Sequence, residues 1–156
     1  MSSWLRHPTP SRTPGVRFLN RSSCVVNPIT RLTRDEAWEL LATSQIGRIA
    51  SARDGAPDIF PVNYVVFGED IYFRTAADSR LRVDCDNRAV AFESAWQLSE
   101  NAWSVVILGH LRTLTLGSDQ EILDKLPILD FAPDRPYVWM QVSADDVRGR
   151  RFSLNT

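Results

Sequence analysis

The sequence predicts a mainly β domain with short helices (α+β), built as a small antiparallel barrel of six strands. Six apolar stretches compatible with β-strands follow one another along the chain, and the first three are joined by tight turns. Two or three short helix-compatible stretches lie between or before them, in the manner of helical plugs. Alternating strand and helix units are absent, which argues against a parallel, Rossmann-type sheet.

The first predicted element is a helix that begins near Thr33 and ends near residue 43. Thr33 and Glu36 have the spacing of a capping box, in which the threonine side chain and the glutamate each accept a backbone N–H. Trp38, Leu40 and Leu41 give this helix an apolar side.

Two further helices are predicted between strands. The stretch 79–87 is short and helix-compatible, with Asp78 or Ser79 as its cap. The stretch 118–126 begins with Ser118 and Glu121, which again have capping-box spacing.

The six predicted strands span residues 46–52, 58–67, 71–75, 88–96, 102–116 and 135–144. Asp54-Gly55 is a strong signal for a hairpin turn between the first two. Pro61 lies in the middle of the second strand and cannot donate a ladder hydrogen bond. It therefore predicts an edge, a bulge, or a place where something other than a strand lies alongside. Gly109 predicts a bulge or bend in the fifth strand.

Composition fits one globular domain with a distinct N-terminal arm. The 156 residues contain no apolar run near the ~18 residues that a membrane helix needs. The first 34 residues hold six arginines and no acid, and the remainder has a net charge of −7 from 12 basic and 19 acidic residues. We therefore expect a flexible basic arm at 1–30, a domain at 31–156, and neither a nucleic-acid nor a membrane partner.

The cysteines and histidines do not have the spacing of a metal site. Cys24 and Cys85 lie far apart, and free thiols fit a reducing cytoplasm, so we expect a cytoplasmic protein without a bound metal. His110 alternates with apolar neighbours and reads as a strand residue rather than as a ligand.

The octet "RTAADSRL" (74–81) places two arginines, a threonine and a serine where a strand ends and a helix begins. Unpaired N–H groups of a first helical turn, hydroxyl donors and guanidinium groups suit an anion such as a phosphate. A solvated polar loop is the alternative. Two other stretches favour a ligand site: "PVNY" (61–64) on the preceding strand, and Trp103-Ser104 at the start of the long fifth strand.

Six segments in this order resemble the pyridoxamine 5′-phosphate oxidase-like family of FMN-binding split barrels. They are "IGRIAS", "PVNYVV", "IYFRTA" followed by "SRL", "VAFE", "WSVVI" and a closing "GRR", and they cover roughly residues 33–152. The chain is most similar to the small nitroimidazole-reductase-like or uncharacterised subgroup. The resemblance implies a six-stranded split barrel and a cytoplasmic homodimer with flavin sites at its interface.

The resemblance also implies a set of cofactor-binding residues. The strand that would run along the isoalloxazine ring carries Pro61, Val62, Asn63 and Tyr64. The group that would hold the ribityl phosphate is Arg74, Thr75, Ser79, Arg80 and Leu81. Trp103 and Ser104, on the long strand, would reach the flavin from the other subunit.

The implied activity is an FMN-dependent oxidoreductase that moves hydride or electrons between FMN and a small molecule. The substrate-gripping Arg-x-His segment of the true oxidase is missing, because the chain has "VRGRRF" and no histidine after His110. Vitamin B6 oxidation is therefore not expected. No catalytic acid or base stands out, and Tyr64 is the nearest to a proton donor.

Two alternatives stay open. The same barrel would serve as a non-catalytic flavin, deazaflavin or haem binding or sensor protein. Haem binding would need His110, the one internal imidazole, to face a pocket. The chain has a single lysine, which argues against a basic site for the polyglutamylated tail of a deazaflavin. A nucleic-acid-binding barrel has only the basic arm in its favour.

Overall fold

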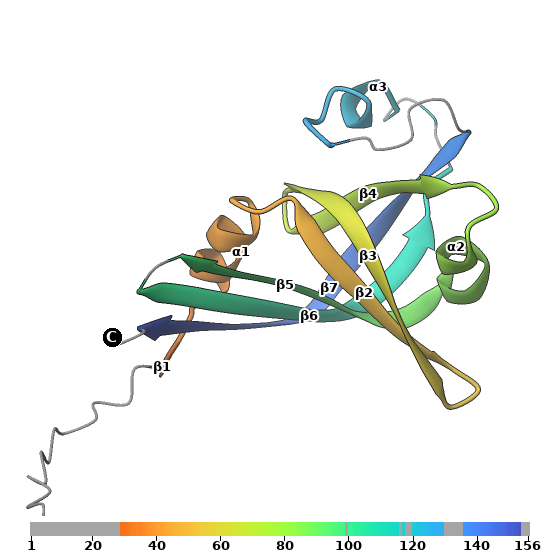
Figure 1. Cartoon of the computed structure of the whole chain (residues 1–156). Helices are drawn as coiled ribbons and strands as arrows, with labels where there is room; N and C mark the ends of the chain where they lie inside the picture. Colours follow the sequence, from red (N-terminus) through yellow and green to blue (C-terminus); the bar gives the residue numbers. More distant parts are fainter. Residues whose placement is uncertain (1–28, 99, 116, 118–119, 130–135, 154–156) are drawn as a thin grey trace, which may run out of the picture.

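Six antiparallel strands close into a ring, and a seventh is added at one edge. The computed structural model describes residues 29–98, 100–115, 117, 120–129 and 136–153. Around the ring the order is β7-β4-β3-β2-β5-β6, and β6 pairs again with β7 (Figure 1). The strands are β2 (Ile46–Arg53), β3 (Ala56–Phe67), β4 (Asp70–Ala76), β5 (Arg88–Leu98), β6 (Asn101–Thr113) and β7 (Tyr137–Ser153), with β1 (Ile29–Arg31) paired to the end of β7.

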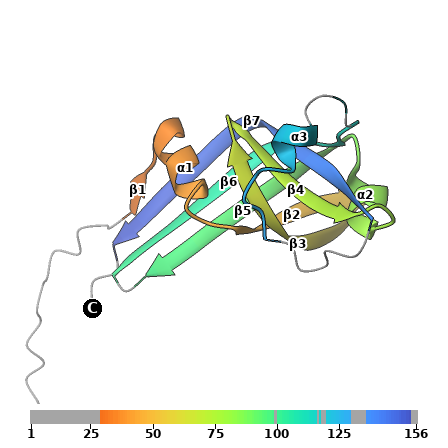
Figure 2. The same ribbon diagram turned by 90° about the horizontal axis from the view of Figure 1, so that it is seen from above.

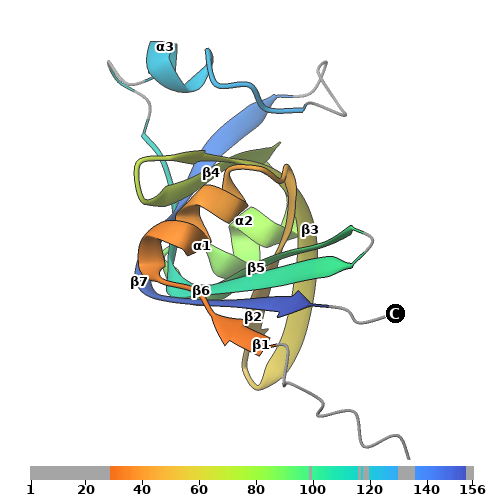
Figure 3. The ribbon, with the colours of Figure 1, turned by 90° about the vertical axis from the view of Figure 1, so that its left-hand side faces the viewer.

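Two short helices close the two ends of this barrel. Helix α1 (Arg34–Leu41) and helix α2 (Arg80–Cys85) lie at opposite ends in Figures 1 and 2, and Figure 3 shows α1 across one mouth of the ring. Trp38 and Leu41 of α1 and Leu81 of α2 join one buried core with residues of every strand from β2 to β7. A third helix, α3 (Gln120–Leu123), lies outside the ring beyond β4 (Figures 1 and 3).

Local sequence signals for α1, α2 and the first hairpin are confirmed. The Thr33 hydroxyl accepts a hydrogen bond from Glu36 N (3.3 Å), and the Glu36 carboxylate accepts one from Thr33 N (2.7 Å), which completes the capping box. Ser79 caps α2 by accepting from Arg82 N (3.2 Å). Asp54 and Gly55 both have positive φ (52° and 81°), as a type I′ hairpin turn requires.

The predicted break at Gly109 is also present. The register between β6 and β7 shifts at Leu108/Gly109, so that Asp145 has no Cα partner in β6. A Cβ atom at Gly109 would lie 2.0 Å from Ser143 O, so only glycine lets the two backbones approach this closely.

Three expectations need correction. The described residues contain seven strands rather than six, because Ile29–Arg31 adds to β7 ahead of the expected start of the fold at Thr33. Strand β7 runs to Ser153, because its polar second half is paired with β6 and β1. Helix α3 is only four residues long, and the predicted cap Ser118 lies outside the described residues.

Strand β3 changes partner in its middle, and this splits the barrel wall. Its first half, Ala56–Asn63, pairs with β2, whereas Tyr64–Phe67 pair with β4. Tyr64 N donates to Gln45 O on the β2 side (2.9 Å), and strand N–H groups alternate in direction. The position of Pro61 therefore points its missing N–H away from β2, toward an edge that no described strand covers. Of the three possibilities that Pro61 left open, the structure shows a strand edge.

Candidate functional site

A pocket of about 410 Å³ opens where β3 and β4 part. The last register pair between the two strands is Tyr64↔Phe73, and the residues beyond it on each strand diverge. This volume lies in the range of about 300–1,000 Å³ typical of small-molecule sites. The lining residues are Phe60, Pro61, Val62, Asn63, Arg74, Thr75, Ala76, Ser79, Arg80, Leu81, Ile128, Leu129, Pro136 and Tyr137.

One side of the pocket is the open edge of β3. Phe60, Pro61 and Val62 present a largely apolar wall, and the chain segment at Ile128 and Leu129 lies across from them. The Asn63 side chain donates to Leu129 O (3.3 Å), which ties the two walls together. A flat, partly apolar ligand suits such a slot, and backbone groups along the open edge offer polar contacts at its rim.

The other side of the pocket is polar and comes from the end of β4 and the start of α2. The Thr75 hydroxyl donates to Ser79 Oγ (2.9 Å), and Ser79 Oγ also accepts from Arg82 N. The two hydroxyls share one hydrogen bond, so one of their two protons is left to donate to a ligand. Helix α2 has six residues and Ser79 already engages one of its first N–H groups, so the hydroxyls and arginines matter more here than the helix terminus.

Arg74 is held in the pocket by aromatic rings. Its guanidinium carbon lies 4.6 Å from the ring centroid of Tyr137 and 5.5 Å from that of Trp139, which are cation–π distances. Asp124 fixes both rings, since its carboxylate accepts from Trp139 Nε1 (2.9 Å) and from the Tyr137 hydroxyl (3.1 Å). The guanidinium group is thereby held against these two rings at the β7 side of the pocket.

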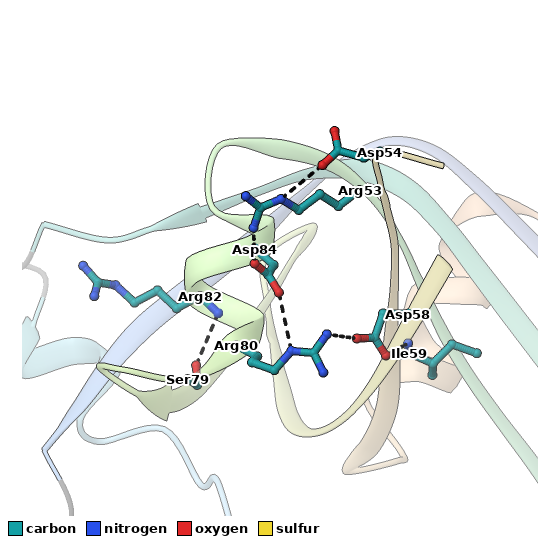
Figure 4. A network of polar contacts seen from close by, with 8 residues as sticks. All are labelled: Arg53, Asp54, Asp58, Ile59, Ser79, Arg80, Arg82 and Asp84. Carbon is teal, nitrogen blue, oxygen red and sulfur yellow. Dashed lines mark hydrogen bonds and ion pairs between the residues drawn. The ribbon is translucent and has the colours of Figure 1, made fainter. Parts of the chain in front are cut away.

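Arg80 lies at the rim in a chain of ion pairs, drawn in Figure 4. Its Nη2 is 2.7 Å from Asp58 and its Nε is 3.5 Å from Asp84, which also contacts Arg53. The Arg80 side chain is 76% exposed. Exposed ion pairs contribute at most about 1 kcal/mol, so Arg80 can exchange an aspartate for a ligand anion at low cost.

Eight of the eleven residues predicted to bind cofactor line this one pocket: Pro61, Val62, Asn63, Arg74, Thr75, Ser79, Arg80 and Leu81. The Tyr64 side chain does not. Its ring is buried, its hydroxyl donates to Leu41 O (2.7 Å), and burial raises the pKa of that hydroxyl above its ordinary value of 10.0. Tyr64 therefore belongs to the core, and it is no proton donor to this pocket.

Trp103 and Ser104 are not brought to the pocket of the same chain. They stand near the start of β6, opposite Trp96 and Ala95 of β5. That end of the β5–β6 hairpin lies at the α1 end of the barrel, far from α2 (Figure 1). Trp103 is 9% exposed and belongs to the core of its own chain. The predicted role of Ser104 would need a second subunit.

Sequence reasoning missed the far wall of the pocket. Ile128, Leu129 and Pro136 lie between α3 and β7 and carry no motif, and Tyr137 is the first residue of β7. The one available signal was the aromatic pair Tyr137 and Trp139 at alternate positions of a predicted strand.

The remaining findings concern His110, metal-ligating side chains and helix length. His110 is 61% exposed beside Asp145 (2.9 Å) and does not line the pocket, so the condition for haem ligation is not met. Within the described ranges there is no cluster of three or more side chains suited to a metal ion. No helix in the described part of the chain is long and apolar enough to cross a membrane.

Known proteins share this architecture. An FAD-binding protein of Mycobacterium smegmatis superposes with a TM-score of 0.75 at 32% identity, over 81% of this chain and 100% of that one. A protein of unknown function from Corynebacterium diphtheriae gives a TM-score of 0.70 at 29% identity, over 80% of this chain and 98% of the other. An uncharacterised protein of Mycobacterium tuberculosis is 32% identical over 104 residues, which cover 62% of this chain and 67% of that relative.

The split barrel with a pocket at the parting of β3 and β4 defines a class of small-molecule-binding domains. Within that class, the family model for pyridoxamine 5′-phosphate oxidase matches residues 33–151. The chain belongs to this family.

Proposed function

We propose that the pocket binds the FMN portion of a flavin, and that the protein is a flavin-dependent oxidoreductase acting on a small molecule. The observation that carries the proposal is the pairing of a slot along the open edge of β3 with a cationic, hydroxyl-rich end at Arg74, Thr75 and Ser79. Family membership and the 32% identity to an FAD-binding protein support it.

The residues present fit a flavin in a definite orientation. The ring system would lie along Pro61–Asn63, with Ile128 and Leu129 excluding water from its other side. The phosphate would lie between Arg74 and the Ser79 hydroxyl, where charge-assisted hydrogen bonds are available. Arg80 would close the rim after giving up Asp58.

When bound, a flavin accepts and donates a hydride or single electrons. The protein's own part is binding and orientation. Among the described residues that line the pocket there is no carboxylate and no histidine.

We further propose a cytoplasmic homodimer in which the start of β6 of one chain completes the pocket of the other, through Ser104 and the surface beside the buried Trp103. Support comes from the hairpin that carries them: Trp96, paired with Trp103, is 58% exposed, as an interface aromatic would be before assembly. The buried free thiol of Cys85 is compatible with a reducing compartment.

The test is the visible spectrum of the purified protein, followed by heat release and identification of any bound flavin. We expect flavin absorption, and its bleaching by nicotinamide donors used as probes with recovery on adding an acceptor. A colourless protein that also fails to bind added FMN at micromolar concentration would refute flavin binding. Bound flavin that no donor reduces would leave a binding protein without turnover.

A further inference from the structure

Asp124 lies outside the proposed flavin pocket, yet it is hydrogen-bonded to both rings that hold Arg74. It directly follows α3, which lies outside the barrel ring (Figures 1 and 3). One carboxylate oxygen, Oδ1, accepts from Trp139 Nε1 (2.9 Å) and from the Tyr137 hydroxyl (3.1 Å). Arg74 and Tyr137 line the pocket and Asp124 does not. Asp124 can therefore act on a ligand in the pocket only through its neighbours.

We propose that Asp124 is a positioning residue for the phosphate of the bound flavin, acting through Trp139 and Tyr137 on Arg74. The inference rests on the proposed function, because it takes Arg74 to bind that phosphate. It gives a role in anion binding to a side chain whose own charge would repel an anion.

The sheet register brings Arg74 and the two rings to one face. Arg74 of β4 is the Cα partner of Trp139 of β7, and Tyr137 is two positions away on the same strand. Alternate residues of a strand face the same side of a sheet, so one guanidinium can meet both rings. The distances of 4.6 Å and 5.5 Å from the guanidinium carbon to the ring centroids agree with this placement.

The hydrogen bonds to Asp124 hold these rings in place. Trp139 is fully buried but is not part of the barrel core, so the packing inside the barrel does not fix its ring. Tyr137 is 36% exposed, so packing restrains it less than a core residue. A buried indole N–H without an acceptor would also cost free energy. Donation to a carboxylate polarises both rings, which strengthens their attraction for a cation.

The charge of Asp124 alone predicts the opposite effect on phosphate binding. A carboxylate repels a nearby phosphate, so its removal would strengthen FMN binding if repulsion were its main influence. If Asp124 instead positions Arg74 through the two rings, its removal weakens FMN binding. Asparagine keeps an oxygen acceptor in this place and lacks the charge, so it separates the two effects.

The experiment is a set of titrations of flavin-free protein with FMN and with riboflavin, which lacks the phosphate. We expect Asp124→Ala to weaken FMN binding about three- to tenfold, as the loss of a cation–π contact would, and to leave riboflavin binding unchanged. Asp124→Asn should stay within about twofold of the wild-type affinity for FMN. In the Arg74→Ala background, Asp124→Ala should cause no further loss.

A matched control and a second variant complete the design. Glu121→Ala removes an exposed carboxylate of α3 and should change neither affinity. If Asp124→Ala does not fold, Tyr137→Phe keeps the ring and loses its hydrogen bond to Asp124. This variant should weaken FMN binding about two- to fivefold and leave riboflavin binding unchanged.

The outcomes separate failure of this inference from failure of the proposed function. Unchanged or tighter FMN binding in the folded test variant, an equal loss for FMN and riboflavin, or a further loss in the Arg74→Ala background overturns the role of Asp124. Equal wild-type affinities for FMN and riboflavin also overturn it, because the phosphate would then gain nothing from Arg74. Each of these results leaves flavin binding standing, whereas binding of neither flavin overturns the proposed function itself.

Discussion

Residues 56–63 and 64–67 belong to one strand, β3, yet different neighbours lie along their free sides. Beside the second half, Tyr64 donates from its backbone to Gln45 O and from its hydroxyl to Leu41 O, so the chain between α1 and β2 occupies that side. Beside the first half lies the 410 Å³ pocket, with Pro61 at the open edge. The change of partner in β3 thus leaves two free strand sides. The side covered by the chain between α1 and β2 contributes to stability, and the uncovered side forms a ligand site.

The largest expected effect comes from removing the side chain that joins the second half of β3 to its cover. Tyr64→Ala should lower the free energy of unfolding by about 3–5 kcal/mol, because a fully buried aromatic ring is lost from the core. Urea denaturation measures this. Tyr64→Phe keeps the ring against Phe92, 4.9 Å between centroids, and should cost only the hydrogen bond to Leu41 O, about 1–3 kcal/mol. A cost below about 1 kcal/mol for the alanine variant would place Tyr64 outside the core.

The next effect concerns the open half and the two arginines at its pocket. Arg74→Ala should weaken FMN binding about 10- to 150-fold, since a charge-assisted hydrogen bond to phosphate contributes about 1.5–3 kcal/mol. Arg80→Ala should weaken it about fivefold or less, because that side chain is 76% exposed and must leave Asp58. Fluorescence titration with FMN distinguishes the two. Equal losses would mean that the ion pairs of Arg80 do not compete with the ligand.

A smaller effect tests whether the backbone nitrogen of Pro61 faces the uncovered edge of β3. Pro61→Ala should lower the free energy of unfolding by only about 0.4–1 kcal/mol, because it frees the unfolded chain and leaves the β2 ladder intact. Val62→Pro is the matched control. Val62 faces Gly47 in register, and its N–H points toward β2, so this change removes a ladder bond and should cost several times more. Similar costs for the two variants would contradict an uncovered edge at Pro61.

The smallest effect concerns the helix that covers the second half. Hydrogen bonding by Thr33 holds the pKa of the Glu36 carboxyl below its ordinary value of 4.5. A lowered carboxyl pKa stabilises the fold above 4.5, and this contribution disappears as the pH falls through the folded-state value. Glu36→Gln should therefore lower Tm slightly at pH 7 and not at all in strongly acid solution.

The control for that change is Glu39→Gln, an exposed glutamate of the same helix that takes no part in the capping box. It should leave Tm unchanged at both pH values. A Tm difference for Glu36→Gln that persisted in strong acid would show that packing, rather than the charge, is responsible.

Local chemistry made much of this molecule predictable. Thr33 with Glu36, Ser79, and Asp54-Gly55 each satisfy backbone groups a few residues away, so the sequence alone locates them. The arginines and hydroxyls of the pocket were also found, because they follow one strand end. The burial of the Tyr64 side chain was not predictable from the sequence. Its hydrogen-bond partner Leu41 is 23 residues away, and the change of partner strand in β3 decides which residues Tyr64 contacts.

Tertiary context decided the remaining elements. Ile29–Arg31 is too short and too exposed to be read as a strand, and only pairing with β7 makes it one. The polar stretch after Ala144 carries no strand signal, yet β6 pairs with it as far as Ser153. The pocket wall at Ile128 and Leu129 lies on a segment whose position depends on the Asp124 contacts with Trp139 and Tyr137.

The pairing of β7 has a consequence for folding during synthesis. This strand pairs with β1, β4 and β6, and it leaves the ribosome after all of them. Until then β4 and β6 each carry an unpaired edge that can recruit a strand from another nascent chain. A nascent chain that is paused before Tyr137 would therefore carry an open sheet rather than a barrel. Chaperones would be needed most until β7 has been synthesised.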